Sequence, residues 1–417
     1  MKQNNFNEEL LKFLKNSPTP FHATLNISTS LQESGFTKLY EADSWNLVIG
    51  KKYYVTRNDS SIIAFAYTKN IVENGVSMLG AHTDSPCLKL KPNTIIQKNG
   101  YIQFGVEVYG GALLNPWFDR DLSLAGRVSG LNTNGEVKEV LIDFKEAIAF
   151  IPSLAIHLDK DANKNRTINA QTDIPPLVMM SSDDDISFNN ILEKKSGLTE
   201  ILDYELLFYD VQDPAFIGLK KEFLASARLD NLLSCYVGLQ AMKSTNLDKS
   251  SLIIFSDHEE VGSESTSGAA GTFLESVLKR MSSSDEDYAR MIDASMMISA
   301  DNAHAIHPNF ASKHDENHGP LINHGPVIKI NANQRYASNS KTNSTFKLLC
   351  REVDVPYQSF VTRTDMGCGS TIGPITATKI GVKTIDIGLP TFAMHSIRES
   401  AGDKDAYMLY KVLKKFL

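Results

Sequence analysis

The pattern of hydrophobic positions changes along the chain from a helical period to a strand period. Phe6, Leu10 and Leu14 recur about every 3.6 residues, which predicts a helix that ends before Pro18. A second helix is expected at about residues 23–35. Strands are then expected at residues 53–56, 61–67 and 76–80.

Residues 92–225 have a different sequence pattern, which is typical of antiparallel strands joined by tight turns. Asn99-Gly100 and Asn134-Gly135 are hairpin signals. Between them, residues 101–108 have alternating apolar positions, as in a half-buried strand. We therefore expect this part of the chain to be β-rich.

After residue 228 the pattern is that of alternating helices and strands. Helices are expected at residues 231–242 and 272–281, and the second should be followed by an acidic loop over residues 282–287. Strands are expected at residues 252–256, 296–300 and 383–388.

These patterns predict an α/β fold with a mainly parallel central sheet. The expected α/β domain is built from both ends of the chain, residues 1–91 and 226–417, and the β-rich residues 92–225 interrupt it as an inserted domain.

Composition narrows the class of protein. The 417 residues carry a net charge of −7 and include no basic block, so nothing indicates a nucleic-acid partner. No apolar run approaches the roughly 18 residues that cross a bilayer, and the N-terminus does not resemble a secretion signal. Four scattered cysteines form no C-x-x-C pair, which disfavours a disulfide framework. We expect a cytoplasmic protein without a membrane partner.

Acidic and histidine residues follow several of the expected strands. They occur within residues 80–86, 257–263, 299–302 and 393–396. Each cluster alone is typical of a surface turn. Together they indicate one site, because ligands of open α/β sheets bind at the carboxyl ends of the strands.

Histidine and carboxylate ligands suit Zn²⁺, Mn²⁺ or Co²⁺. The sequence offers five candidate ligands, which is more than one tetrahedral zinc ion needs. If Asp230 bridges two metal ions, each ion would have three protein ligands, with a water between the two ions. Asp84 is placed to orient the imidazole of His82. The candidate ligands are His82, Asp230, Glu260, Asp301 and His395.

Glu259 is the candidate general base. If residues 259 and 260 are extended, neighbouring side chains point in opposite directions, so Glu260 can bind metal while Glu259 takes a proton from the activated water. This arrangement predicts hydrolysis of an amide bond.

Many segments in matching order carry a resemblance to a known family. They are His82-Thr-Asp84-Ser-Pro, Asn115-Pro-Trp-Phe-Asp119-Arg-Asp121, Leu154-Ala-Ile-His157-Leu, Ala227-Arg-Leu-Asp230-Asn, Asp257-His-Glu259-Glu260-Val-Gly, Ser299-Ala-Asp301, His304, His307-Pro-Asn, Asn331-Ala-Asn-Gln-Arg-Tyr336 and Met394-His395-Ser-Ile-Arg398-Glu. Over nearly its whole length the chain resembles the aspartyl aminopeptidases, metallopeptidase family eighteen.

The resemblance implies a three-layer zinc-aminopeptidase domain with a β-rich insertion that makes subunit contacts, in a homo-oligomer that is a dodecamer. It assigns one metal to His82, Asp230 and Asp301, the other to Asp230, Glu260 and His395, and the base to Glu259. It also implies that His157 reaches the active site of a neighbouring subunit. The substrates would be peptides that lose one N-terminal residue.

Substrate preference stays open. By the resemblance, Lys329 would favour N-terminal Asp or Glu, but a lysine between two isoleucines is also typical of any half-exposed strand. Tyr336 could hydrogen-bond the scissile carbonyl or be an ordinary buried tyrosine. Aminopeptidase action on neutral residues, carboxypeptidase or deacylase activity, and a binding protein without activity are the alternatives. The histidines between 304 and 324 are expected in a loop near the site, none of them a ligand.

Overall fold

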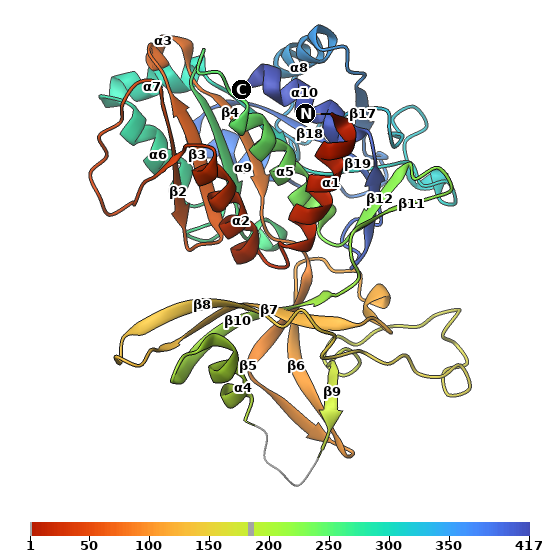
Figure 1. Cartoon of the computed structure of the whole chain (residues 1–417). Helices are drawn as coiled ribbons and strands as arrows, with labels where there is room; N and C mark the ends of the chain where they lie inside the picture. The colour runs from red at the N-terminus through yellow and green to blue at the C-terminus, as the bar shows by residue number, and fades with distance from the viewer. Residues whose placement is uncertain (1, 182–186) are drawn as a thin grey trace. The chain divides into compact units, whose positions relative to one another are not determined.

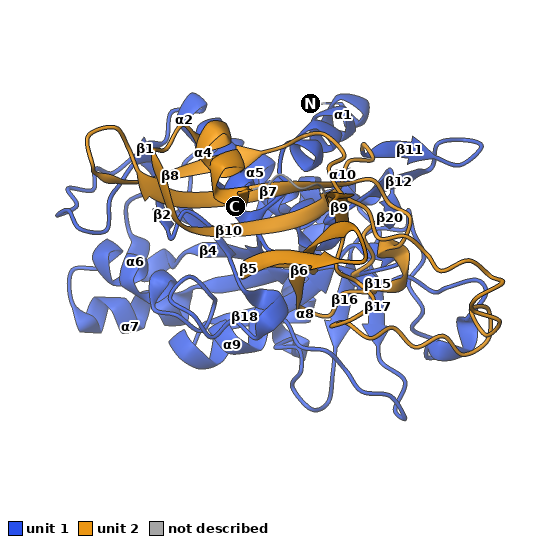
Figure 2. Ribbon diagram, turned by 90° about the horizontal axis from the view of Figure 1, so that it is seen from below, with its two compact units in different colours: residues 1–84, 214–394, 399–417 blue, residues 85–213, 395–398 orange. Residues whose placement is uncertain are grey.

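The structure is a computed structural model that describes residues 2–181 and 187–417. The chain forms two compact units, coloured separately in Figure 2. The first unit consists of Met1–Asp84, Pro214–Met394 and Glu399–Leu417, and the second of Ser85–Asp213 and His395–Arg398. The expected domain limits, 1–91 with 226–417 and 92–225, and the subunit-contact role of the insertion stay predictions.

A nine-stranded sheet runs through the described part of the first unit, in the order β1-β2-β3-β13-β4-β14-β18-β16-β17. Figure 1 labels β2, β3, β4, β17 and β18 of this sheet. In its middle, β13, β4, β14 and β18 are mutually parallel, so their carboxyl ends share one edge. The strands are β1 (Thr37–Lys38), β2 (Lys51–Arg57), β3 (Ser61–Tyr67), β4 (Ser77–His82), β13 (Ser251–Ser256), β14 (Met296–Ala300), β16 (Val327–Ile330), β17 (Gln358–Val361) and β18 (Lys383–Gly388).

Helices cover this sheet because its strands are apolar on both faces. Along β13, Ile253 and Phe255 belong to one buried cluster, while Leu252 and Ile254 belong to another, as expected from the two-residue period of a strand. The first cluster includes residues of α1 (Gln3–Lys15), α2 (Pro20–Glu33), α5 (Leu229–Lys243), α8 (Ser340–Glu352) and α10 (Asp405–Phe416). The second includes residues of α3 (Ile71–Asn74), α6 (Phe273–Met281), α7 (Asp285–Ala294) and α9 (Ile372–Ile380).

A smaller five-stranded sheet, in the order β11-β12-β20-β19-β15, also belongs to the first unit. Its strands are β11 (Ala215–Ile217), β12 (Phe223–Ser226), β20 (Glu399–Gly402), β19 (Pro390–Phe392) and β15 (Ala303–His304). Single-turn helices lie at Glu259–Val261 and Ala311–Lys313.

The second unit contains a six-stranded sheet, in the order β8-β7-β10-β5-β6-β9, whose pairings are all antiparallel. Its elements are β5 (Cys87–Lys98), β6 (Tyr101–Tyr109), a turn of helix at Asn115–Trp117, β7 (Leu122–Leu131), β8 (Val137–Asp143), β9 (Leu177–Met180), α4 (Phe188–Ser196) and β10 (Glu200–Asp210).

One local prediction was wrong. The acidic loop expected over residues 282–287 ends at Ser284, because Asp285 already begins α7. The Ser284 side chain accepts a hydrogen bond from Asp287 N, 3.1 Å away. Acidic residues in a first turn interact favourably with the helix dipole, so this serine and the acids after it form a helix start.

The prediction of an α/β chain is confirmed, since the structure mixes helices with several sheets. Among the described residues, no helix combines the length and apolar character that crossing a membrane requires.

Candidate metal centre

Three neighbouring parallel strands bring the predicted site residues together. His82 is the last residue of β4, Asp301 directly follows β14, and Glu259 and Glu260 follow β13 by three and four residues. Because β4 lies between β13 and β14, these side chains meet at the carboxyl edge of the sheet. Asp230 reaches the same place from the start of α5.

The beginning of α5 is shaped so that Asp230 can reach the site. Asp230 and Asn231 have non-helical backbone angles inside α5, and the peptide bond between them is cis. Asn231 Nδ2 donates to Ala300 O at 2.8 Å, at the end of β14, and Asp230 N donates to a Glu399 oxygen at 2.9 Å. These bonds attach the start of the helix to the last residue of β14 and to the first residue of β20, one strand from each sheet of the unit.

His82, Asp230 and Asp301 have a geometry that suits zinc. His82 Nε2 lies 3.4 Å from Asp230 Oδ1 and 3.6 Å from Asp301 Oδ1. Tetrahedral zinc, with bonds of about 2.1 Å, keeps neighbouring ligand atoms about 3.4 Å apart. Imidazole nitrogen and carboxylate oxygen are also ligands that zinc prefers, so this group of donors fits the metal.

Asp84 holds two parts of the site at once. Its carboxylate accepts hydrogen bonds from Glu259 N and Glu260 N, each 3.1 Å away. His82 Nδ1 lies 3.3 Å from Asp84 Oδ1 and 3.1 Å from Asp84 O. Asp84 therefore lies against the ring nitrogen of His82 that faces away from Asp230, and its role in orienting this imidazole stays a prediction.

Residues 259 and 260 are not extended, contrary to expectation. They form a single helical turn, Glu259–Val261, because both backbone N–H groups point at the one carboxylate of Asp84. Both glutamates offer an oxygen within 4.8 Å of a His82 ring nitrogen. The geometric reason for separating their roles is thus wrong, and the assignment of base and ligand stays a prediction.

Acidic groups dominate the electrostatics of this edge. Burial raises the pKa of Glu259 to about 7 and that of Glu260 well above its ordinary value. For His82, burial lowers the pKa, but hydrogen bonds with Asp230, Asp301 and Asp84 raise it well above 6.5 overall. So many buried carboxylates near one imidazole are favourable only with additional positive charge, which a divalent ion supplies.

Lys329 and Tyr336 lie next to Asp301. Lys329, on β16, is buried, and its Nζ is 3.1 Å from Asp301 Oδ2. Burial would raise the pKa of Asp301, but Lys329 and His82 outweigh it and lower this pKa. The Tyr336 ring centre is 5.3 Å from Lys329 Nζ, and a hydrogen bond with Cys368 adds to burial in raising the tyrosine pKa.

His395 and His157 belong to the second unit. His395 Nδ1 lies 3.2 Å from Gly111 O. His157 is exposed in a turn, between the exposed side chains of Ile156 and Leu158. Their expected roles, as a metal ligand and as a residue that reaches a neighbouring subunit, stay predictions.

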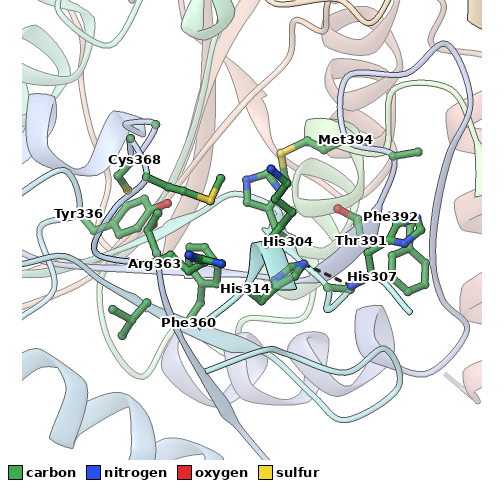
Figure 3. A pocket seen from close by; sticks show the side chains of 18 residues that line it. His304, His307, His314, Tyr336, Phe360, Arg363, Cys368, Thr391, Phe392 and Met394 are labelled. Carbon is green, nitrogen blue, oxygen red and sulfur yellow. Dashed lines mark hydrogen bonds between the residues drawn. The ribbon is translucent and has the colours of Figure 1, made fainter. Parts of the chain in front are cut away.

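The expected histidine loop is wrong for His304, which is the last residue of β15, whereas His307 and His314 follow outside this strand. These three histidines line a cavity of about 310 Å³. Figure 3 shows His304, His307 and His314 around it, facing Tyr336 and Phe360. Burial lowers the pKa of His304, and Asp230 and Asp301 are near enough to influence it. Sequence patterns did not indicate that Phe360, Arg363 and Cys368 line this cavity, because no local signal connects these residues with the metal site.

An α/β fold with carboxylates and a histidine grouped at the carboxyl edge of its sheet fits a metal-dependent enzyme. The family of aminopeptidase I zinc metalloproteases (M18) matches residues 13–417, and the chain belongs to this family. It is therefore an aminopeptidase of the zinc metalloprotease class, as the resemblance implied.

Relatives and solved structures agree with this membership. "Probable M18 family aminopeptidase 2" of Pseudomonas aeruginosa (strain UCBPP-PA14) is 54% identical to this chain over an alignment of 418 positions, which covers 98% of this chain and 97% of the relative. A chain in the structure of the Ape4 and Nbr1 complex superposes on this chain with a TM-score of 0.95 at 38% sequence identity. The match covers 99% of this chain and 85% of that one. A chain of the S. cerevisiae mApe1 dodecamer matches with a TM-score of 0.88 at 29% sequence identity. This match covers 99% of the present chain and 96% of the mApe1 chain.

Proposed function

We propose that this aminopeptidase removes single N-terminal residues from peptides with two zinc ions and a water activated between them. The observation that carries the proposal is the convergence of His82, Asp230 and Asp301 at zinc-ligand spacing. These three residues would hold one ion. Asp230, Glu260 and His395 would hold the other, so Asp230 serves both.

The bound ions would supply Lewis acidity, which polarises the scissile carbonyl and brings the pKa of the shared water towards about 7. In this proposal Glu259 accepts the proton of that water and later gives it to the leaving amine. Asp84 keeps His82 and the glutamate turn in place.

We propose that N-terminal Asp or Glu is preferred. Lys329 has three N–H donors, so it can hold Asp301 and also bind an acidic side chain of the substrate. Tyr336, next to Lys329, would donate a hydrogen bond to the scissile carbonyl. Preference for neutral residues is the alternative, in which Lys329 serves Asp301 alone.

We further propose that the protein is a homo-oligomer, namely a dodecamer, in which the second unit makes subunit contacts. One similar structure is that of a dodecamer. The turn that carries His157 exposes Leu154, Ile156 and Leu158, and apolar side chains grouped this way are typical of protein–protein contacts. His157 would complete the active site of a neighbouring subunit.

The test is a panel of aminoacyl chromogenic substrates and short peptides, assayed after loading with zinc, manganese or cobalt. We expect release of the residue that has the free amine, fastest for Asp and Glu, and loss of activity with a chelator. Release from the carboxyl end would instead indicate a carboxypeptidase. A metal-loaded protein inert towards the whole panel would indicate a binding protein, and full activity of metal-free protein would exclude the mechanism.

A further inference from the structure

Asp386 is a buried carboxylate that connects two loop segments. It lies on β18 and is 1% exposed. Its Oδ2 accepts a hydrogen bond from Ala337 N, and its Oδ1 accepts one from Thr371 Oγ1, both at 2.6 Å. The Ser338 hydroxyl also bonds the backbone of Asp386, with Oγ 3.2 Å from O and 3.0 Å from N. One residue thus holds both segments.

The surroundings of Asp386 are shaped to accept its carboxylate. A Cβ atom at Gly373 would lie 2.3 Å from each carboxylate oxygen, so only glycine leaves the space. Gly373 is in the first turn of α9, where the helix dipole favours a negative charge. The carboxylate therefore occupies a site in which the backbone, the hydroxyl of Thr371 and the helix all suit an acceptor.

The two segments carry neighbouring parts of the cavity wall. Ala337 directly follows Tyr336, and Thr371 comes three residues after Cys368. Cys368 packs against the cluster that contains Tyr336, and both residues line the cavity of about 310 Å³ shown in Figure 3. A shift of either segment would therefore move this tyrosine–cysteine pair.

We propose that Asp386 is a positioning residue that fixes Tyr336 and Cys368 in the wall of this cavity. By holding Ala337 it sets the position of the Tyr336 hydroxyl, and by holding Thr371 it sets the position of the Cys368 thiol. The consequence for catalysis rests on the proposed aminopeptidase function, but the positioning itself does not.

The thiol gives a readout that is independent of activity. Cys368 is partly exposed, while Cys87, Cys235 and Cys350 are buried, so a small aromatic disulfide reagent should label Cys368 first in the native protein. Thr371→Val deletes one hydrogen bond to Asp386 at nearly constant volume, so the segment that carries Cys368 is held less firmly and the labelling rate should rise about tenfold. Thr371→Ser, which keeps the hydroxyl, should restore the wild-type rate.

The matched control is Thr384→Val. Thr384, like Asp386, is a buried residue of β18, but its hydroxyl donates to Val382 O, just before the strand. We expect its labelling rate to stay within twofold of wild type. If Thr371→Val labels as slowly as this control, the positioning role of Asp386 towards Cys368 is overturned.

A kinetic cycle tests the Tyr336 side. Asp386→Ala should lower kcat at least tenfold with little change in KM, and Asp386→Asn should restore most of it, because an amide oxygen can still accept from Ala337 N. In a Tyr336→Phe background, Asp386→Ala should lower kcat no further. Additive losses would overturn the inference. If Tyr336→Phe alone leaves kcat unchanged, the proposed role of Tyr336 fails, and the thiol labelling still decides the role of Asp386.

Discussion

Replacing Lys329 by methionine removes the ammonium beside Asp301 and keeps most of the apolar stem. In the wild-type chain the two charged atoms are 3.1 Å apart, and the side chains are only 4% and 13% exposed. At an effective dielectric constant of about 20, unit charges at this distance attract by about 5 kcal/mol. Deleting one partner of a buried pair typically costs about 3–5 kcal/mol, so metal-free Lys329→Met should lose about that much stability.

The loss should be smaller when zinc is bound, because a zinc ion on Asp301 supplies another positive charge beside the same carboxylate. Urea unfolding followed by circular dichroism, in chelator and in excess zinc, measures both cases. We expect the shift in unfolding midpoint between wild type and Lys329→Met to be at least twice as large in chelator. Lys341→Met is the control, since Lys341 is an exposed residue of α8.

Two results would refute this reasoning. Equal shifts in chelator and in zinc would mean that Asp301 gains no charge compensation from the metal and is not a ligand. A shift no larger than that of Lys341→Met would mean that the buried ion pair does not stabilise the fold.

Further predictions concern the glutamate pair, a titrating acid and the core. Glu259→Gln should lower kcat about 10²–10⁴-fold with zinc content unchanged, while Glu260→Gln should lower zinc content measured by mass spectrometry; the reverse pattern would exchange the two roles. Burial raises the pKa of Asp405 from 3.8 to about 7, so the folded chain binds a proton that the unfolded chain releases, and stability should fall as pH rises from about 4 to 7. Urea unfolding of Asp405→Asn should show a flatter pH dependence than wild type, and an unchanged slope would contradict this. Gly238→Ala should cost about 1–3 kcal/mol in the same measurement, because its Cβ would lie 2.4 Å from a Leu79 methyl; wild-type stability would show that the core adapts freely.

The central strands could be predicted because their signal is local. Residues 61–67 and 296–300 are mostly apolar runs of strand length, and residues 383–388 alternate polar positions with Ile385 and Ile387. The strands β3, β14 and β18 have these same limits. The convergence of His82 and Asp301 also followed from sequence, since residues at the carboxyl ends of neighbouring parallel strands lie together. The position of a residue at the end of such a strand can therefore be predicted without knowing any side-chain contacts.

The remaining features depend on contacts between distant segments, which leave no periodic pattern. Asp84 bends the glutamate turn through bonds to residues 175 and 176 positions away, so the turn could not be distinguished from an extended loop. The partner of Lys329 is 28 positions away, and the bonds of Asp386 span 15 and 49 positions. Each of these became visible only when the packed strands brought the segments together.

Anomalous diffraction at the zinc edge, from crystals of the zinc-loaded enzyme, tests the paired-metal proposal most directly. We expect two peaks per chain about 3.5–4 Å apart, one against His82 and Asp301, the other against Glu260 and His395, with Asp230 touching both. A single peak, or peaks bound by other side chains, would contradict the proposal.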